Sequence, residues 1–377
     1  MENDITKLQN VVSLKSDYID LIDTNFVSYR PGNINQKLSS FLNSYFTKNH
    51  YHPDSKGLLC ARKAIALYYA NRKLKISADK LLLTASSSES YSLIFNTLKD
   101  ADSEVLLPNP TYPLFEHLSS FSSLKSVYYQ LDRHNHWQPD IKDIESKITK
   151  NTKFIVFISP NNPTGSVIEL RIYQQLMNLA VENKLTVICD EVFSEFYYNS
   201  RPQMPDINQF KTNIFILNGI SKILAAADLK LAWLGFNNYV ATDIIEKLEL
   251  VNDCYLNANY FSQEALPMIL PLVNEVRGAI MPMLEENKAV LSHLCQQNSL
   301  YFSCNMPEGG IHAMLHLNST LDEDTLVCEL LKQKSVNTHP GYFYDYDCTE
   351  PSLIISLLQN PEKFAKGLFK IKEFVIQ

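Results

Sequence analysis

Polar side chains that could bind or react with a ligand follow several of the apolar runs in this sequence. A serine cluster at 86–88 opens a stretch of helical periodicity, where hydroxyls and free backbone N–H groups favour a bound phosphate. Tyr112 can stack on a planar ring, and the carboxylate of Asp190 can pair with a protonated pyridine nitrogen. Lys222 lies between the apolar runs NIFILN and ILAAA, where a lysine can lose its proton and form a Schiff base. Together these requirements describe a site for pyridoxal phosphate.

The elements that must hold these groups are short apolar runs rich in Val, Ile, Leu and Phe. Most of them follow a stretch of helical periodicity, and this alternation predicts an α/β fold with a mostly parallel sheet covered on both faces. Because ligands bind beyond the carboxyl ends of the strands in such a sheet, we expect the candidate groups along one rim. The runs are LLLT (81–84), EVLL (104–107), KFIVFI (153–158), LTVICD (185–190), NIFILN (213–218) and KLAWLGF (230–236).

The pattern changes after about Asn259, which predicts a second, smaller domain. A long helical segment there leads into mixed short runs that include EGGIHAMLHL (308–317) and SLIISLL (352–358), typical of an α+β arrangement. We therefore expect three parts along the chain. They are an N-terminal arm with a short helix (1–45), a large cofactor-binding domain (46–260) and a small C-terminal domain (261–377).

Composition and residue spacing exclude several other classes of protein. Lys plus Arg number 34 and Asp plus Glu 41 among 377 residues, a formal charge of −7 without a basic block, so neither nucleic acid nor an anionic membrane is an expected partner. The ten glycines lack the spacing of a dinucleotide fingerprint, a P-loop or a GxSxG elbow. The seven cysteines form no CxxC pair and there is no HExxH motif, so no metal site is expected.

The location of the protein is predicted from its start and its apolar runs. The opening residues MENDITKLQN are polar and acidic, unlike a signal peptide. The longest apolar stretch, around 265–273, is interrupted by prolines and is too short to cross a bilayer. We expect a soluble, cytoplasmic protein.

An ordered set of motifs resembles the class I/II aminotransferases, which are pyridoxal phosphate enzymes of fold type I. The resemblance rests first on SPNNPTG (159–165), DEVF (190–193) and SKILAAADLKLAWLG (221–235). It extends from about residue 50 to 358 in the family's order and intervals, and it implies that family's architecture, with a mostly parallel seven-stranded sheet in the large domain and a smaller α+β domain. The further motifs are YHPDSKGLLCARKAIA (51–66), PNPTYP (108–113), EGG (308–310) and HPGYF (339–343).

The resemblance also implies a role for each matching residue. Lys222 would hold the cofactor as a Schiff base and act as general acid and base at the substrate carbon, and Asp190 would keep the pyridine nitrogen protonated. Asn162 would hydrogen-bond the phenolic oxygen of the ring, on which Tyr112 would stack. Tyr51 falls where a tyrosine reaches the phosphate of the neighbouring subunit, which implies a homodimer with shared active sites. The other residues implied in phosphate binding are Ser86, Ser87, Ser88, Ser221 and Lys230.

This sequence departs from the family's pattern at four positions. Phe193 stands where a tyrosine is common, Lys230 where an arginine is usual and Gly219 where many members have a serine. Ile354 fills the place of the arginine that grips the substrate α-carboxylate. We therefore expect poor use of aspartate and glutamate, and a substrate that lacks a free α-carboxylate or is held by another cation. The candidates for that cation are Arg30 and His339.

Three functions are compatible with this pattern. The first is an aminotransferase that moves an amino group between a small amine or amino acid and a keto or aldehyde acceptor. The second is a decarboxylase or lyase with the same cofactor, since an apolar carboxylate pocket can favour loss of CO2. The third is a non-catalytic cofactor-binding sensor, although the N-terminal 45 residues are too few and too poor in basic residues for a DNA-binding module.

Overall fold

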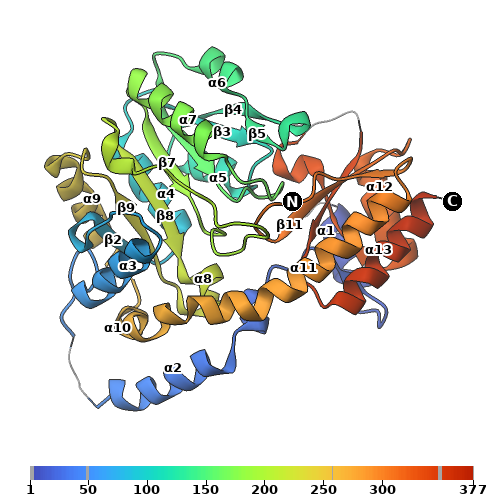
Figure 1. Ribbon diagram of the computed structural model, residues 1–377, viewed down its shortest axis with the longest axis horizontal. Helices are drawn as coiled ribbons and strands as arrows, with labels where there is room; N and C mark the ends of the chain where they lie inside the picture. The colour runs from blue at the N-terminus through green and yellow to red at the C-terminus, as the bar shows by residue number, and fades with distance from the viewer. Residues whose placement is uncertain (1–3, 48–50, 257, 347–349, 377) are drawn as a thin grey trace.

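The computed structural model describes residues 4–47, 51–256, 258–346 and 350–376. Its centre is an eight-stranded sheet in the order β2-β9-β8-β7-β6-β3-β4-β5 (Figure 1). Neighbours within the series β8, β7, β6, β3 and β4 run parallel, and β9 is antiparallel to both β2 and β8. The strands are β2 (Leu81–Thr84), β3 (Glu104–Asn109), β4 (Lys125–Asp132), β5 (Gln138–Pro139), β6 (Thr152–Ile158), β7 (Thr186–Asp190), β8 (Ile214–Gly219) and β9 (Ala232–Phe236).

The expected mostly parallel sheet is confirmed, with one addition. Six strands contain the predicted apolar runs, and β4, which no predicted run covers, completes the seven strands that the resemblance implies. The eighth is β5, a two-residue strand that pairs antiparallel with the end of β4. So short a strand leaves no apolar run for a sequence pattern to detect.

Helices cover both faces of this sheet, because alternate residues of each strand belong to two separate hydrophobic clusters. In β6, for example, Ile155 and Phe157 face the cluster that includes α3 and α7, while Phe154 and Val156 face the one that includes α4, α5 and α9. The helices of this region are α3 (Leu59–Asn71), α4 (Ser87–Leu98), α5 (Leu114–Phe121), α6 (Ile141–Lys147), α7 (Leu170–Glu182), α8 (Ile220–Ile223), α9 (Thr242–Cys254) and α10 (Tyr260–Ile269).

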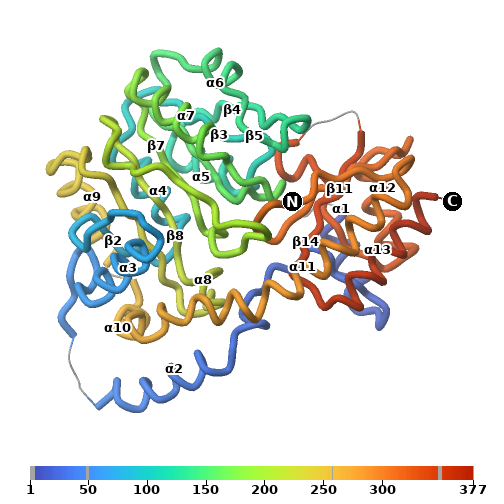
Figure 2. Tube along the Cα trace, in the orientation of Figure 1, coloured from blue at the N-terminus to red at the C-terminus, as the bar shows by residue number. Residues whose placement is uncertain are grey.

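The small domain is built on a four-stranded antiparallel sheet in the order β10-β11-β14-β13. The long helix α11 runs from beside α10 to the small domain, so it joins the two parts of the molecule (Figure 2). The elements are β10 (Phe302–Ser303), β11 (His312–Leu317), β13 (His339–Pro340), β14 (Ser352–Ser356), α11 (Val273–Gln297), α12 (Glu323–Glu329) and α13 (Pro361–Val375).

The N-terminal segment, predicted as an arm, contacts both parts of the molecule. Helix α1 (Asp4–Val12) packs on α12, and β1 (Ile19–Asp20) pairs in parallel with β12 (Val336–Asn337), so both belong to the small domain. Helix α2 (Gly32–Tyr45) lies at the edge of the large domain and contacts α10 (Figure 1). Helix α10 packs on α3 and so lies with the large domain, whereas α11 also packs on α13. The connection between the large and the small domain therefore runs along α11.

None of the helices in the described residues is both long and apolar enough to cross a membrane. The same residues contain no group of three or more His, Cys, Asp or Glu side chains placed to hold a metal ion.

Candidate active site

A cavity of about 390 Å³ opens where the strand ends of the large sheet face the small domain. The predicted strand-end groups meet here because parallel strands bring their carboxyl ends to one rim. The predicted residues on its wall are Ser87, Ser88, Tyr112, Asn162, Asp190, Ser221, Lys222 and His339, and they are joined there by Gly219 and Phe193.

Lys222 reaches the cavity from α8, the single turn that follows β8. Its Nζ atom lies 5.1 Å from the ring centre of Phe26 and 5.9 Å from that of Phe193, so aromatic faces surround the amine. Burial lowers the pKa of Lys222, and the nearby charge of Lys230 lowers it further. The surroundings therefore favour the neutral, nucleophilic form of this amine more than water does.

Asp190 ends β7 and is buried, and it forms no ion pair within the described part of the chain. Its Oδ2 accepts a hydrogen bond of 2.9 Å from the Tyr91 hydroxyl, and its Oδ1 accepts one of 3.0 Å from the backbone N–H of Val192. Burial raises the pKa of Asp190 to about 6, although both hydrogen bonds act to lower it. A protonated pyridine nitrogen of a bound ligand would be the positively charged partner that Asp190 lacks among the described residues.

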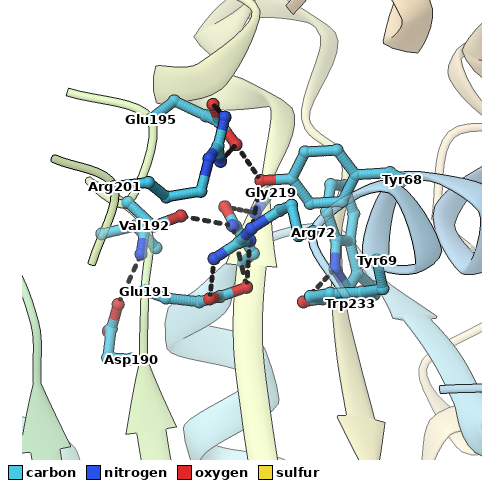
Figure 3. Close-up of polar contacts among 12 residues, drawn as sticks. Tyr68, Tyr69, Arg72, Asp190, Glu191, Val192, Glu195, Arg201, Gly219 and Trp233 are labelled. Carbon is cyan, nitrogen blue, oxygen red and sulfur yellow. Dashed lines mark hydrogen bonds and ion pairs between the residues drawn. The ribbon is translucent and has the colours of Figure 1, made fainter. Parts of the chain in front are cut away.

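A buried ionic network fixes the chain directly behind Asp190 (Figure 3). The guanidinium of Arg72, from the end of α3, pairs with Glu191 through two hydrogen bonds of 2.9 and 2.7 Å. Arg72 also donates to the Tyr68 hydroxyl, which in turn donates to Glu195 at 2.7 Å. Such a bidentate pair holds one geometry, so it sets the direction in which the chain leaves β7.

The three serines at 86–88 have two different roles: one caps a helix and two line the cavity. The Ser86 Oγ accepts a hydrogen bond of 3.1 Å from the Glu89 N–H, so Ser86 is the N-cap of α4 and does not line the cavity. Ser87 and Ser88, in the first turn of this twelve-residue helix, do line it, and Ser221 faces it from α8. Their hydroxyls and the α4 N-terminus form an anion site.

Asn162 and Tyr112 are two further predicted residues on the cavity wall. The Oδ1 atom of Asn162 is buried and has no hydrogen-bond partner among the described residues, so the amide is available to a ligand. Tyr112 lines the cavity, is 37% exposed, and has its ring edge-on to that of Phe115.

Besides Ser86, three predicted residues lie outside this cavity. Tyr51 is 61% exposed and packs on Tyr260, with 5.0 Å between ring centres. Lys230 is exposed and acts on Lys222 only through its charge. Arg30 forms a bidentate pair with Asp228, with hydrogen bonds of 2.8 and 3.0 Å, which engages the guanidinium away from the cavity.

The small domain supplies the wall opposite the strand ends. His312 and His339 line the cavity, and the Nδ1 atom of His339 is 3.3 Å from the Tyr344 hydroxyl. Burial lowers the pKa of His312 to about 3 and that of His339 to about 4, so both imidazoles are uncharged at neutral pH.

Sequence reasoning overlooked three residues of the site: Tyr91, His312 and Phe26. Tyr91 follows Ser87 by four residues, so helical periodicity could have placed it on the same face of α4. His312 stands in a segment already noted for its strand pattern, but nothing local shows which way a strand faces. Phe26 packs over Lys222 from a turn nearly two hundred residues earlier, which no local pattern predicts.

The residues present fit pyridoxal phosphate. The buried amine of Lys222 matches the cofactor's aldehyde, and the carboxylate of Asp190, which has no cation partner among the described residues, matches its pyridine nitrogen. The amide of Asn162 on the cavity wall can donate to its phenolic oxygen, Tyr112 matches its ring, and the hydroxyls at the α4 N-terminus match its phosphate. Together with the covered sheet and the small domain, this site defines a pyridoxal phosphate transferase of fold type I.

Comparison with known proteins gives the family. The model of the family described as aminotransferase class I and II matches residues 33–365, so the chain belongs to this family. Alanine aminotransferase of Mycobacterium tuberculosis is 28% identical over 319 residues, which cover 81% of this chain and 74% of the relative. Glutamate-pyruvate aminotransferase AlaA of Escherichia coli is 28% identical over 320 residues, covering 81% and 77% respectively.

Solved structures agree over the whole chain. A crystal structure of an aminotransferase from Escherichia coli superimposes with a TM-score of 0.88 at 25% identity, covering 100% of this chain and 95% of that one. Alanine aminotransferase from Pyrococcus furiosus has the same fold, with a TM-score of 0.89 at 24% identity and coverage of 99% and 96%. The fold-type I architecture and the dependence on pyridoxal phosphate expected from the sequence are confirmed.

Proposed function

We propose that this chain transfers amino groups at the cavity described above, with Lys222 and Asp190 as its catalytic residues. One observation carries the proposal: an amine and a carboxylate, both with pKa values shifted by burial towards their neutral forms, face the same cavity without pairing with each other. Perturbed titratable groups in a cleft are typical of catalytic sites. The named relatives are aminotransferases, which favours transamination over a decarboxylase, a lyase or a sensor.

The side chains divide the work between binding and proton transfer. Pyridoxal phosphate, when bound, supplies an aldehyde that condenses with amines and a ring that accepts electrons. The Nζ atom of Lys222 would hold the cofactor covalently, and its lowered pKa would let it accept and return a proton at the substrate carbon. The carboxylate of Asp190, held by Tyr91 and Val192, would keep the ring nitrogen protonated.

The other residues would fix the position of the ring. The hydroxyls of Ser87, Ser88 and Ser221 would bind the phosphate, while Ser86 contributes by capping α4. Asn162 would hydrogen-bond the phenolic oxygen and Tyr112 would lie against the ring.

Borohydride reduction tests the attachment site. Protein loaded with pyridoxal phosphate is reduced and digested, and the labelled peptide is identified by mass spectrometry. We expect the label on Lys222, and no label and no turnover in Lys222→Ala, whereas Lys63→Ala, which changes an exposed lysine of α3, keeps both. Label on a different lysine contradicts the proposal.

The product distinguishes transamination from the alternatives. A panel of amines and amino acids is added while the cofactor spectrum and CO2 release are followed. Transamination converts the cofactor to its pyridoxamine form and yields a keto or aldehyde product; CO2 release without that product would favour the decarboxylase.

We further propose that the chain acts as a homodimer in the cytoplasm. Aromatic side chains of α2 and α10, among them Phe41, Tyr45 and Phe261, pack together at the edge of the molecule, and the neighbouring Phe46 and Tyr51 are 70% and 61% exposed. A contiguous exposed aromatic surface of this kind favours a protein interface. The described cysteines are all free thiols, which supports a reducing compartment.

A further inference from the structure

The register of the small sheet shows which side chains face the reacting groups. Ile354 of β14 lies directly opposite Met314 of β11 on one side and His339 of β13 on the other. His312, two residues before Met314, lies on the same face because strand side chains alternate. His312 and His339 line the cavity, and Ile354, fully buried, fills the position between the two strands that carry them.

This wall carries no positive charge. Both imidazoles are neutral at neutral pH because they are buried. Lys222 is the only Lys or Arg among the described residues that line the cavity, and in the proposed function its amine would hold the cofactor. Arg30, the other cation expected from the sequence, does not line the cavity and is held by two hydrogen bonds to Asp228.

The remaining charges make the cavity unfavourable for a second anion. The charge of Asp190 would be paired with the protonated ring nitrogen of the cofactor, and the cofactor would add a phosphate. A carboxylate on the amine-bearing carbon of a substrate would lose its hydration against the neutral imidazoles without gaining a cation from the described residues of the wall.

We propose that the natural substrate is a primary amine whose amine-bearing carbon carries an uncharged polar group, such as a hydroxymethyl or an amide, in place of a free carboxylate. His312 and His339 are the residues that would hydrogen-bond this group, since a neutral imidazole offers one donor and one acceptor. This inference rests on the proposed function. Overall, the donor R2CH–NH2 exchanges its amino group and one hydrogen for the oxygen of the cofactor aldehyde, so no other oxidant or reductant is required.

Binding of unreactive analogues tests the inference apart from turnover. 2-Methylalanine and 2-methylalaninamide lack the hydrogen that transamination removes and differ only in the carboxylate. We expect the amide to bind the cofactor-loaded protein on the order of ten- to a hundredfold more tightly, by titration calorimetry at constant ionic strength. Equal binding, or tighter binding of the acid, overturns the inference.

Turnover of matched donors gives a second measurement. L-Alaninamide and (S)-2-aminopropan-1-ol are compared with L-alanine, L-aspartate and L-glutamate by conversion of the cofactor to its pyridoxamine form. We expect kcat/KM to be at least about tenfold higher for the uncharged donors. Amino acids that react as well as or better than their uncharged counterparts would overturn the substrate assignment but leave the proposed function intact. Failure of Lys222 labelling would instead overturn the function.

A designed cation tests the wall itself. In Ile354→Arg, a guanidinium beside His339 would pair with a carboxylate, and we expect the preference for 2-methylalaninamide over 2-methylalanine to fall by at least about tenfold. Leu300→Arg is the matched control, because it adds the same charge at a position that is 78% exposed and does not line the cavity. If a folded Ile354→Arg protein keeps the wild-type preference, this wall does not select the substrate. If Ile354→Arg does not fold, the binding of 2-methylalanine and 2-methylalaninamide to the wild-type protein is the deciding measurement.

Discussion

At the scale of single residues, the site depends on burying two groups that would be charged in water. Lys222 and Asp190 each lose hydration, and neither has a partner of opposite charge among the described residues. In the absence of cofactor this arrangement costs stability, since a buried carboxylate without a cation is unfavourable. Such a cost is common at functional sites.

The free-energy cost of burying the Asp190 carboxylate predicts how the stability of the cofactor-free protein depends on pH. Its pKa is about 6 in the folded protein and about 3.9 in unfolded chains, so the folded state binds this proton more tightly. The contribution of Asp190 to stability is therefore complete below pH 4 and is lost as pH rises through 6. We expect cofactor-free Asp190→Asn to be more stable than wild type by about 1–3 kcal/mol at pH 8, and to gain little at pH 4.

Urea unfolding of the cofactor-free proteins across this pH range measures the difference. Asp253→Asn, at an exposed position in α9, should show no such pH-dependent gain. An equal effect of Asp190→Asn at both pH values would mean that Asp190 is not perturbed by burial.

At the scale of elements, the junction of α3 with the end of β7 is held by the pair between Arg72 and Glu191. The side chains of both are almost completely buried, 7% and 3% exposed, and their N–O distance is 2.7 Å. Removing one partner leaves the other charge buried and unpaired, which costs more than the pair itself contributes.

We expect Arg72→Met to lower the free energy of unfolding by about 3–5 kcal/mol. The double variant Arg72→Met with Glu191→Met should recover a large part of this loss, because no unpaired charge remains. Lys153→Met, which breaks the partly exposed pair with Asp100, should change stability by less than about 1 kcal/mol. Urea unfolding checks all three, and an additive double variant would contradict the coupling.

At the scale of the whole molecule, Tyr51 connects the active site with assembly. It lies outside its own cavity, on the aromatic edge formed by α2 and α10. If it instead completes the site of a second copy, Lys222→Ala and Tyr51→Phe are defects in different halves of one shared site.

Subunit exchange between these two variants should therefore restore activity, since each mixed dimer would contain one site with both Lys222 and Tyr51 intact. Activity is followed after mixing, with each variant alone as the control. A monomeric mass by light scattering at the assay concentration, or activity that stays at the sum of the separate variants, would contradict shared sites.

The sequence by itself determined the groups of the site and the rim on which they meet. Alternating apolar runs and helical stretches are local patterns, and parallel strands must present their carboxyl ends together. Lys222, Asp190, Asn162 and Tyr112 could therefore be assigned to one cavity before their geometry was known.

The tertiary structure alone decided which neighbouring residues face that cavity and what charge they carry. Ser86 and Ser87 are adjacent in the chain, yet one caps α4 and the other lines the cavity. Arg30 meets Asp228 across 198 residues, and His312 and His339 arrive from a sheet whose facing depends on its register. These outcomes depend on contacts between distant segments and on burial, which shifts pKa values through the whole surroundings of a group and is not encoded in any local pattern.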